Sequence, residues 1–375
     1  MKIIVIGAGI LGASTAYHLA KLGAEVLVID RYDSGQATDA AAGIVCPWLS
    51  QRRNKAWYEL AKGGASYYPK LIAQLEADGE TNTGYKRVGA INLHTVPEKL
   101  EQMAERARKR REDAPEIGEI SILSPSETKS LFPALADEYG AVYVSGGARV
   151  DGRAVRDALM RAAQKHGASL LRGNASIVTE GKRFMGIHLE GTLLPADQVI
   201  VTGGAWSKEL LAPLGVEFFV KPQKAQIIHL ELPNADTGSW PVVMPVSNQY
   251  ILTFENGRVV VGSTHENEAG FDPRVTAGGI QEILNKALEV APGLSDSTYL
   301  ETRVGFRPFT PGFLPVMGAL PDYDGIYVAN GLGASGLTSG PYIGAELAKH
   351  VAGKPTEIDF NLYDVAGAIG NGRNG

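Results

Sequence analysis

The 375-residue chain contains little of what marks several common classes of protein. It has one cysteine, Cys46, which excludes a disulfide framework and a cysteine-based zinc cluster. The formal net charge of −5 gives no basic field for nucleic acid. No apolar run approaches the roughly 18 residues that a membrane-spanning helix needs, and Met1 starts no recognisable signal peptide. We therefore expect a cytoplasmic protein that binds neither nucleic acid nor a metal cluster.

What is present suffices for a large α/β fold. Hydrophobic residues make up 44% of the chain, which is enough for a substantial core. A length of 375 residues allows two domains or one large α/β domain. The 45 glycines gather in a few loops, and these loops carry the strongest functional signals.

Residues 2–30 predict a strand, a turn, a helix and a second strand. The apolar run at 2–6 is typical of a strand that is buried on both faces of a parallel sheet. Residues 10–22 have helical periodicity, and a glycine follows them. Residues 25–30 form the second predicted strand.

The turn between the first strand and the helix carries G-x-G-x-x-G at Gly7, Gly9 and Gly12. In a dinucleotide-binding unit the first glycine permits the tight turn, the second lets the backbone approach the pyrophosphate, and the third lets helix and strand pack closely. Asp30 follows 18 residues after Gly12 and is placed to hold a ribose hydroxyl pair, which disfavours NADP. The alternative interpretation is a glycine-rich structural turn.

A second glycine-rich segment occupies residues 325–350. It predicts a strand at 326–329, a glycine loop at 331–336 and a helix at about 338–351. The positive end of that helix suits the negatively charged pyrimidine part of a reduced flavin. The first unit alone leaves NAD and FAD open, whereas two ends of one chain that meet on a long dinucleotide favour FAD.

The sequence resembles the D-amino-acid oxidase superfamily of flavoproteins, and within it the glycine oxidase and D-amino-acid dehydrogenase branch. The resemblance spreads over nearly the whole chain in the family's order. It is carried by IGAGILGASTAYHLAKLGAEVLVID at 6–30, ATDAAAGIV at 37–45, VIVTGGAWS at 199–207, YILTFENGRVVVGSTHE at 250–266, RVGFRPFTPGFLPVMG at 303–318, and the segment 325–350.

This resemblance implies an α/β fold in which a Rossmann-like FAD-binding domain is interleaved with an α+β substrate domain built on an antiparallel sheet. The FAD-binding domain would comprise residues 1–82, 146–218 and 306–375. The substrate domain would comprise residues 83–145 and 219–305 and form a roof over the flavin.

Local patterns agree with a largely antiparallel roof. Residues 219–231, 242–254 and 258–264 predict strands, and Asn256-Gly257 predicts a hairpin turn between the last two. Two helices are predicted at 97–112 and 274–290.

The family motif also implies which residues contact the cofactor. Related sarcosine oxidases attach flavin through a cysteine near the position of Gly305, where this chain has none, so we expect non-covalent FAD. The implied cofactor residues are Gly7, Gly9, Ile10, Leu11, Gly12, Asp30, Arg31, Thr38, Ala42, Gly43, Ile44, Gly331, Leu332, Gly333, Ala334, Ser335, Gly336, Leu337 and Thr338.

For the substrate, the resemblance implies that Arg307 in GFRP binds a carboxylate and that Tyr250 is a second donor. A guanidinium matches a carboxylate with paired N–H donors. The alternative for Arg307 is a structural salt bridge, for example to Glu301. Glycine oxidase has a second arginine where this chain has Ala334, so a strict preference for glycine is not expected. The space would suit an N-substituted glycine.

The expected reaction is oxidative deamination of a small amino acid, such as glycine, sarcosine, another N-alkyl glycine or a small D-amino acid. Hydride would pass from the α-carbon to flavin N5, and O₂ would be reduced to peroxide. A dehydrogenase that passes electrons to a quinone or a partner protein is the first alternative. An NAD-dependent or non-catalytic dinucleotide-binding protein is the second. The sequence leaves the oligomeric state open, and a homo-oligomer is one of the alternatives.

Three other residues have more than one interpretation. Cys46 is expected to be a small buried hydrophobe that is not catalytic. Trp48 either walls the active site or packs in the core. His265 follows a predicted strand, where a lone histidine is more often a polar strand end than a ligand contact.

Overall fold

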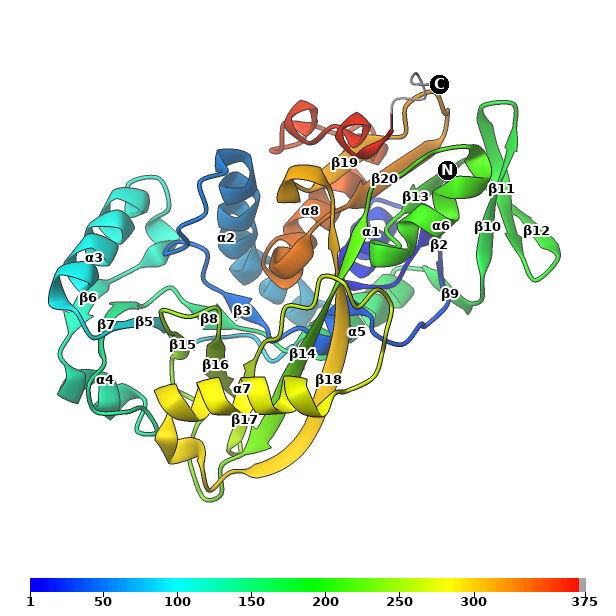
Figure 1. The fold of residues 1–375 in the computed structure, drawn as a ribbon. Helices are drawn as coiled ribbons and strands as arrows, with labels where there is room; N and C mark the ends of the chain where they lie inside the picture. Colours follow the sequence, from blue (N-terminus) through cyan, green and yellow to red (C-terminus); the bar gives the residue numbers. More distant parts are fainter. Residues whose placement is uncertain (371–375) are drawn as a thin grey trace.

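The computed structural model describes residues 1–370, which form two large sheets flanked by helices (Figure 1). Within these residues the first sheet has six strands in the order β19-β20-β13-β1-β2-β9. Five of them run parallel, and β19 is antiparallel to β20. The strands are β1 (Lys2–Ile6), β2 (Glu25–Asp30), β9 (Ser169–Arg172), β13 (Gln198–Val201), β19 (Val316–Ala319) and β20 (Ile326–Asn330).

The first sheet is covered on both faces, which explains the unbroken apolar run of β1. Ile3 and Val5 pack into a core that they share with helices α1 (Ile10–Lys21), α5 (Gly152–Lys165) and α8 (Gly336–Val351). Ile4 and Ile6 point to the opposite face, as the two-residue period of a strand requires. There they pack against the antiparallel strands β10 (Ala175–Glu180), β11 (Arg183–Leu189) and β12 (Thr192–Pro195).

The second sheet has eight strands in the described part of the chain, in the order β18-β14-β17-β16-β15-β5-β7-β6. All neighbours are antiparallel except β15 and β5, which are parallel. The strands are β5 (Ala90–His94), β6 (Ile120–Leu123), β7 (Gly140–Val144), β14 (Lys221–Glu231), β15 (Val242–Met244), β16 (Tyr250–Thr253), β17 (Arg258–Gly262) and β18 (Thr298–Phe309).

One face of the second sheet is apolar and closed. Val243, Ile251 and Val261 are buried there against Ile283 of helix α7 (Ala277–Val290). The long strands β14 and β18 extend from this sheet toward the first one (Figure 1). The remaining elements are β3 (Ile44–Val45), β4 (Lys86–Arg87), β8 (Ala148–Arg149), α2 (Lys55–Ala77), α3 (Pro97–Arg111), α4 (Pro125–Leu131) and α6 (Ser207–Leu211).

This architecture confirms the predicted α/β class with a Rossmann-like part and a separate, mostly antiparallel sheet. The predicted helices at 97–112 and 274–290 are α3 and α7, although α7 begins three residues later. The division into two interleaved domains at the expected boundaries stays a prediction.

One strand prediction is wrong. Residues 242–254 do not form a single strand, because a loop at 245–249 separates β15 from β16. Pro245 has no backbone N–H to give to a neighbouring strand, so the ladder stops there. The predicted hairpin turn is confirmed: Asn256 and Gly257 have φ of 59° and 72°, and they join the antiparallel strands β16 and β17.

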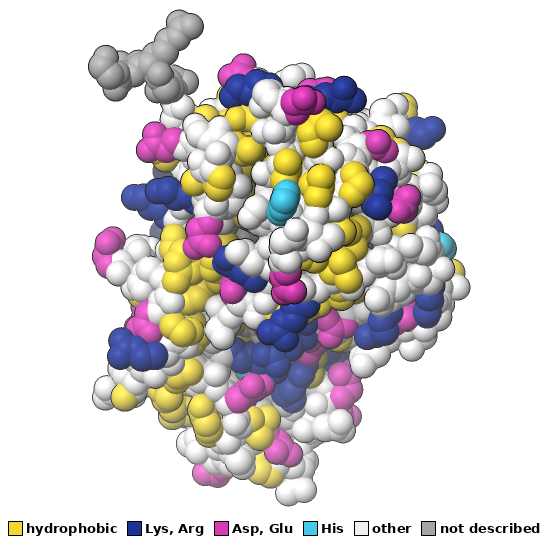
Figure 2. Space-filling model, turned by 90° about the vertical axis from the view of Figure 1, so that its right-hand side faces the viewer, with side chains coloured by type: hydrophobic (Ala, Val, Ile, Leu, Met, Phe, Trp, Pro, Cys, Tyr) yellow, Lys and Arg dark blue, Asp and Glu magenta, His cyan; other side chains and the backbone are white. Residues whose placement is uncertain are grey.

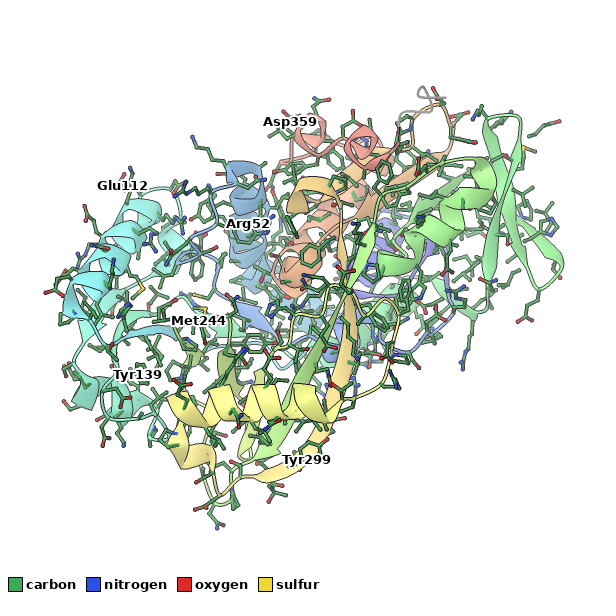
Figure 3. All side chains as sticks on the ribbon, viewed as in Figure 1. Arg52, Glu112, Tyr139, Met244, Tyr299 and Asp359 are labelled. Atoms are coloured by element: carbon green, nitrogen blue, oxygen red, sulfur yellow. The ribbon has the colours of Figure 1, made fainter. Side chains whose placement is uncertain are left out.

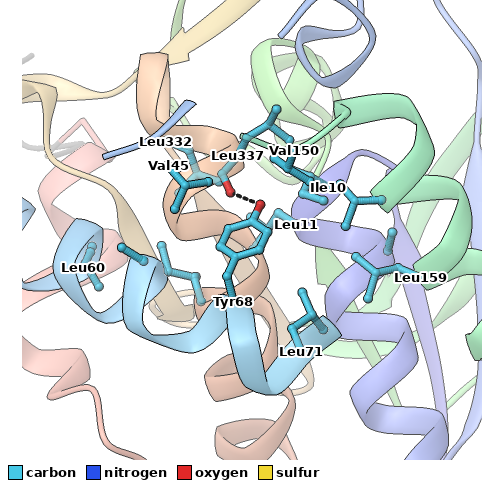
Figure 4. Close-up of a cluster of buried hydrophobic side chains, with 14 of the residues drawn as sticks. Ile10, Leu11, Val45, Leu60, Tyr68, Leu71, Val150, Leu159, Leu332 and Leu337 are labelled. Atoms are coloured by element: carbon cyan, nitrogen blue, oxygen red, sulfur yellow. Dashed lines mark hydrogen bonds between the residues drawn. The ribbon is translucent and has the colours of Figure 1, made fainter. Parts of the chain in front are cut away.

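Helix α2 holds the C-terminal glycine loop in place. The Tyr68 hydroxyl donates to the Leu337 carbonyl at 2.6 Å, as Figure 4 shows among the apolar side chains around it. A Cβ at Gly64 would lie 2.1 Å from the Thr338 carbonyl oxygen. Glycine therefore lets α2 approach the first turn of α8 more closely than any other residue could.

The surface on the face shown in Figure 2 mixes Lys and Arg with Asp and Glu and with scattered hydrophobic side chains. Along residues 1–370, no helix is long and apolar enough to cross a membrane.

Gly64→Ala tests the contact between α2 and α8. Alanine favours an isolated helix, but its Cβ would clash with the Thr338 carbonyl, so we expect a net loss of about 1–3 kcal/mol. The matched control is Gly278→Ala in the first turn of α7, where a Cβ meets nothing within 4 Å and no loss of stability is expected. Thermal unfolding measures the midpoint temperature of each variant against the wild type. Equal midpoints for Gly64→Ala and the wild type would contradict the close contact between α2 and α8.

Candidate active site

A cavity of about 620 Å³ lies between the carboxyl ends of the parallel strands and the open face of the second sheet. It brings together residues from both ends of the chain and from the roof. All the predicted site residues except Gly12 line it: Gly7, Gly9, Ile10, Leu11, Asp30, Arg31, Thr38, Ala42, Gly43, Ile44, Tyr250, Arg307, Gly331, Leu332, Gly333, Ala334, Ser335, Gly336, Leu337 and Thr338.

Gly12 shapes the cavity without lining it. A Cβ at this position would lie 1.8 Å from the Gly7 carbonyl oxygen and 2.6 Å from Thr202 Oγ1. Gly12 thus allows α1 to pack against the turn that precedes it. The prediction of a direct cofactor contact at Gly12 finds no support here, whereas its expected packing role matches the geometry.

Asp30 ends β2 at one end of the cavity and is held by its own surroundings. Its Oδ2 accepts the backbone N–H of Ala8 at 2.6 Å. Its Oδ1 accepts the N–H of Tyr32 at 2.5 Å and the Nε2 of Gln36 at 2.8 Å. These bonds fix the carboxylate beside the glycine turn, where its remaining lone pairs can accept from hydroxyl groups.

Arg31 lines the same end, but its guanidinium is already paired. It donates to Asp33 Oδ2 at 2.8 Å and to Glu209 Oε2 at 3.2 Å. Neighbouring carboxylates raise the pKa of this guanidinium above its usual value, although burial opposes them. If Arg31 contacts the cofactor as predicted, its backbone is therefore better suited to make the contact than its paired guanidinium.

Two helix N-termini face the cavity, at Ile10 of α1 and at Gly336 of α8. Neither helix has an acidic residue in its first turn. The Ile10 N–H donates to Thr38 Oγ1 at 3.0 Å, which ties α1 to the small-residue loop. The amides of the first helical turns and the two positive dipole ends make this region suited to an anion such as a pyrophosphate.

Small residues let two loops approach the cavity with bare backbone. Gly43 has a φ of +99°, and a Cβ there would lie 1.8 Å from the Val150 carbonyl oxygen. Gly331 has a φ of +81° and closely contacts Thr310. The Thr338 hydroxyl donates to the Ile44 carbonyl at 2.9 Å, so the N-terminal and C-terminal loops are bonded to each other.

Arg307 projects from β18 into the roof of the cavity. Its Nη1 donates to Gln223 Oε1 at 3.1 Å and its Nη2 to Ser263 Oγ at 2.7 Å, and both acceptors are neutral. Burial lowers the pKa of the guanidinium from its usual value, and the nearby Tyr250 opposes that shift. Arginine still keeps its proton.

The alternative structural role for Arg307 is wrong as stated, because Glu301 pairs with Arg303 at 2.5 Å. Six residues along a strand place Glu301 and Arg307 about 20 Å apart. Among residues 1–370, no carboxylate lies within 4.0 Å of the Arg307 guanidinium.

Tyr250 stands at the start of β16 and completes the roof beside Arg307. Burial raises the pKa of its phenol above the usual value, and Arg307 partly offsets this rise. The phenol is therefore a neutral hydrogen-bond donor at physiological pH.

Several residues that line the cavity or hold Arg307 escaped the sequence analysis. Gln223 and Ser263 hold Arg307, while Asn92 and Gln249 belong to the cavity lining. No spacing pattern marks these four, because they come from separate strands or loops. Ser263 lies in the recognised segment 250–266, which was the one available signal.

Of the three residues with more than one interpretation, Cys46 and His265 line the cavity and Trp48 does not. Cys46 lines the cavity but is buried, and burial raises the pKa of its thiol to about 12. Trp48 is buried in the core and does not line the cavity, so the packing interpretation applies. His265 lines the cavity, and burial lowers its pKa below the usual range.

Comparison with known proteins agrees with this geometry. The family model described as FAD dependent oxidoreductase matches residues 2–350. The chain belongs to this family. Its membership decides for FAD against the NAD-dependent and non-catalytic alternatives, and it shows that the protein is an oxidoreductase of the amino-acid or amine class.

Three relatives of this FAD-dependent oxidoreductase are informative. An uncharacterized oxidoreductase, YurR, of Bacillus subtilis (strain 168) is 66% identical over 98% of this chain and 99% of the relative. A glycine oxidase of Pseudomonas aeruginosa is 30% identical, and the match covers 98% of this chain and 99% of that enzyme. The crystal structure of an iminodiacetate oxidase (IdaA) from Chelativorans sp. BNC1 is 47% identical with a TM-score of 0.94, covering 96% of this chain and 98% of that one.

The residues present fit FAD. One cavity is lined both by the carboxylate of Asp30 and by the cation of Arg307. Glycines whose Cβ atoms would clash line its middle, as at Gly7 and Gly43, and two helix N-termini supply amides. We infer that Asp30 holds the ribose and that the helix amides hold the pyrophosphate.

Asp30→Ala should lower the FAD content of the purified protein severely. The substitution removes the hydroxyl acceptor and leaves the buried N–H of Ala8 without its partner, which costs about 1–3 kcal/mol. The ratio of flavin to protein absorbance measures the outcome. The control is Asp236→Ala, on a loop away from the cavity, which should keep the wild-type ratio. Full FAD content in Asp30→Ala would contradict the ribose assignment.

The single cysteine should resist alkylation. With a pKa of about 12, the Cys46 thiol has roughly 1,000-fold less thiolate at pH 8 than a free cysteine, and the thiolate is the nucleophile. Because the chain has no other thiol, intact mass after iodoacetamide treatment gives the rate directly. Denatured protein is the control, and rapid modification of the native holoenzyme would contradict the burial.

Proposed function

We propose that this protein oxidises N-substituted glycines and related small amino acids, with O₂ as electron acceptor. The observation that carries the proposal is Arg307, a permanent cation in the roof of the flavin cavity whose partners are the neutral Gln223 and Ser263. A buried charge without a counter-ion is costly, and a substrate carboxylate would remove that cost.

The roof would orient the substrate through its carboxylate. The guanidinium of Arg307 presents paired N–H donors, which match two carboxylate oxygens. The neutral hydroxyl of Tyr250 supplies another donor. With the carboxylate held in this way, the α-carbon has one fixed position in the cavity, which is the main contribution that a protein makes to such a reaction.

The cavity continues past Tyr250 along the sheet. Tyr250, Met244 and Asn92 lie in one row across β16, β15 and β5, since Val243 pairs with Ile251 and Met244 with Asn92. All three line the cavity, and Figure 3 marks Met244 at the end of β15. Two strand spacings mean that this row of cavity-lining residues extends about 10 Å along the sheet from Tyr250.

The part of the cavity along this row would accommodate a substituent on the substrate nitrogen. Ala334, which also lines the cavity, presents only a methyl group. The similar iminodiacetate oxidase supports the same class, because iminodiacetate is a glycine whose nitrogen carries a second carboxymethyl group.

The conversion would consume a secondary amine, O₂ and water, and it would yield a primary amine, glyoxylate and hydrogen peroxide. FAD, when bound, supplies the two-electron acceptor for oxidation of the carbon–nitrogen bond to an imine, which water then hydrolyses. The oxidases among the similar proteins support O₂ as the acceptor.

Anaerobic flavin bleaching with a panel of substrates tests the proposal. We expect iminodiacetate and N-methylglycine to reduce the flavin faster than glycine, D-alanine or D-proline. Arg307→Ala should lower the efficiency of reduction by a factor on the order of 10². Arg307→Lys should lower the efficiency of reduction less than Arg307→Ala does, because lysine keeps the positive charge. Some loss is still expected, because lysine lacks the paired N–H donors.

Arg108→Ala on the exposed face of α3 is the matched control and should behave as wild type. Peroxide release during aerobic turnover would support O₂ as acceptor, and its absence would favour a dehydrogenase. Bleaching that is indifferent to Arg307 would make this arginine structural and overturn the carboxylate assignment.

A further inference from the structure

His265 is the side chain in the described cavity lining that is best suited to take up a proton at neutral pH. The other titratable side chains that line the cavity are Asp30, Arg31, Asp33, Cys46, Tyr250 and Arg307. The two carboxylates lie at and after the end of β2, where they bond to backbone amides and to Arg31. Arginine keeps its proton, and burial raises the pKa of the thiol and of the phenol. This leaves the imidazole as the base of the roof.

His265 lies on the same side of its segment as Ser263. Residues 263–266 continue from β17 along β14, where the Glu266 N–H donates to a β14 carbonyl at 2.9 Å. Thr264 and Glu266 do not line the cavity, and the Thr264 hydroxyl donates to Glu266 Oε1 at 2.7 Å. Ser263 and His265 both line it, as the alternation along an extended segment requires. The two cavity-facing residues are therefore neighbours on one wall.

This placement brings the imidazole close to the carboxylate site. The Ser263 hydroxyl accepts from Arg307 Nη2 at 2.7 Å, and His265 follows about 7 Å farther along the segment. A substrate whose carboxylate binds Arg307 carries its nitrogen on the adjacent carbon. His265 can therefore reach that nitrogen directly or through one water. His265 is also exposed, so a proton that it takes up can pass to solvent.

The charges around His265 favour a neutral imidazole. Partial burial and the cation of Arg307 lower its pKa below the usual value. From α7, Glu282 and Lys286 act on this pKa in opposite directions, and they pair with each other at 2.6 Å. The adjacent Glu266 is paired with a buried lysine of β14 at 3.4 Å. A neutral imidazole has one ring nitrogen that accepts a proton.

The reaction needs such an acceptor. An aliphatic ammonium group loses its proton only near about pH 10, so a small amino acid reaches the cavity in its ammonium form. Oxidation at the α-carbon uses the nitrogen lone pair, which an ammonium group lacks. One proton therefore has to leave the bound substrate before the carbon–nitrogen bond is oxidised.

We propose that His265 accepts this proton from the ammonium group of the bound substrate and releases it to solvent, which makes His265 a catalytic residue of the reaction. The transfer leaves a neutral amine and an imidazolium. The imidazolium returns to its neutral form by giving the proton to water, so the side chain is ready for the next substrate. This inference rests on the proposed function and deepens it.

The pH dependence of flavin reduction tests the inference on the holoenzyme. Rapid anaerobic mixing with N-methylglycine gives the reduction rate at pH 7 and near pH 10. The variants are His265→Asn, which removes the titrating group, and His265→Ala, which leaves space for added imidazole. His188→Asn is the matched control, because His188 is exposed on β11 and does not line the cavity. Methoxyacetate has a carboxylate but no amine, and the perturbed flavin spectrum gives its dissociation constant.

We expect both His265 variants to reduce the flavin about 100-fold more slowly than wild type at pH 7, the lower end of general-base catalysis. Near pH 10 the difference should shrink to less than about 3-fold, because the amine arrives neutral. Added imidazole should restore part of the rate of His265→Ala at pH 7. Methoxyacetate binding should change less than about 2-fold, because the Arg307 site keeps its hydrogen bonds.

A loss of the same size at both pH values would show that His265 only supports the fold of the site and would overturn the inference. An unchanged reduction rate at pH 7 would also overturn it, as would methoxyacetate binding that weakens as much as the rate falls. A wild-type flavin that no amine of the panel reduces would instead refute the proposed function itself.

Discussion

The site depends on the close packing of the last long helix against the first. Gly344 of α8 faces Ser14 of α1, where a Cβ would lie 2.7 Å from the serine Cβ, and the Ser14 hydroxyl donates to the Pro341 carbonyl at 2.7 Å. Only a small residue permits this approach. Because the two helices touch, their N-termini open on the same cavity, and two positive dipole ends are brought to one place. An anionic cofactor stabilises that arrangement, so the cavity is complete only when the two ends of the chain meet.

The charged side chains that line the cavity come from two places. Asp30, Asp33 and the paired Arg31 line it at and after the end of β2, and Arg307 lines it from β18. Each region comes from a different element, and the neutral acceptors Gln223 and Ser263 hold the guanidinium without cancelling its charge. In the proposed function, a substrate carboxylate would bind beside this guanidinium.

The parts that could be predicted are those with a local physical cause. The glycine turn, Asp30 and the first two strands follow from steric rules and hydrophobic periodicity within thirty residues. The Asn256-Gly257 hairpin follows from the φ angles that a tight turn requires. The failures have tertiary causes. Pro245 interrupts an apolar run that otherwise resembles one long strand. Glu301 is close to Arg307 in sequence, but an extended strand carries it away to pair with Arg303.

The sequence by itself determined the fold class, the cofactor loops and the arginine that the substrate would meet, because each depends on residue types at short spacing or on a motif carried in order along the chain. Only the tertiary structure decided what surrounds that arginine. Gln223, Ser263, Gln249 and Asn92 come from four strands or loops whose sheet order does not follow the chain order. Sheet register places Gln223 beside Arg307 and Asn92 beside Met244, and hydrogen bonds join Arg307 to Gln223 and Ser263. No short-range pattern encodes contacts of that kind.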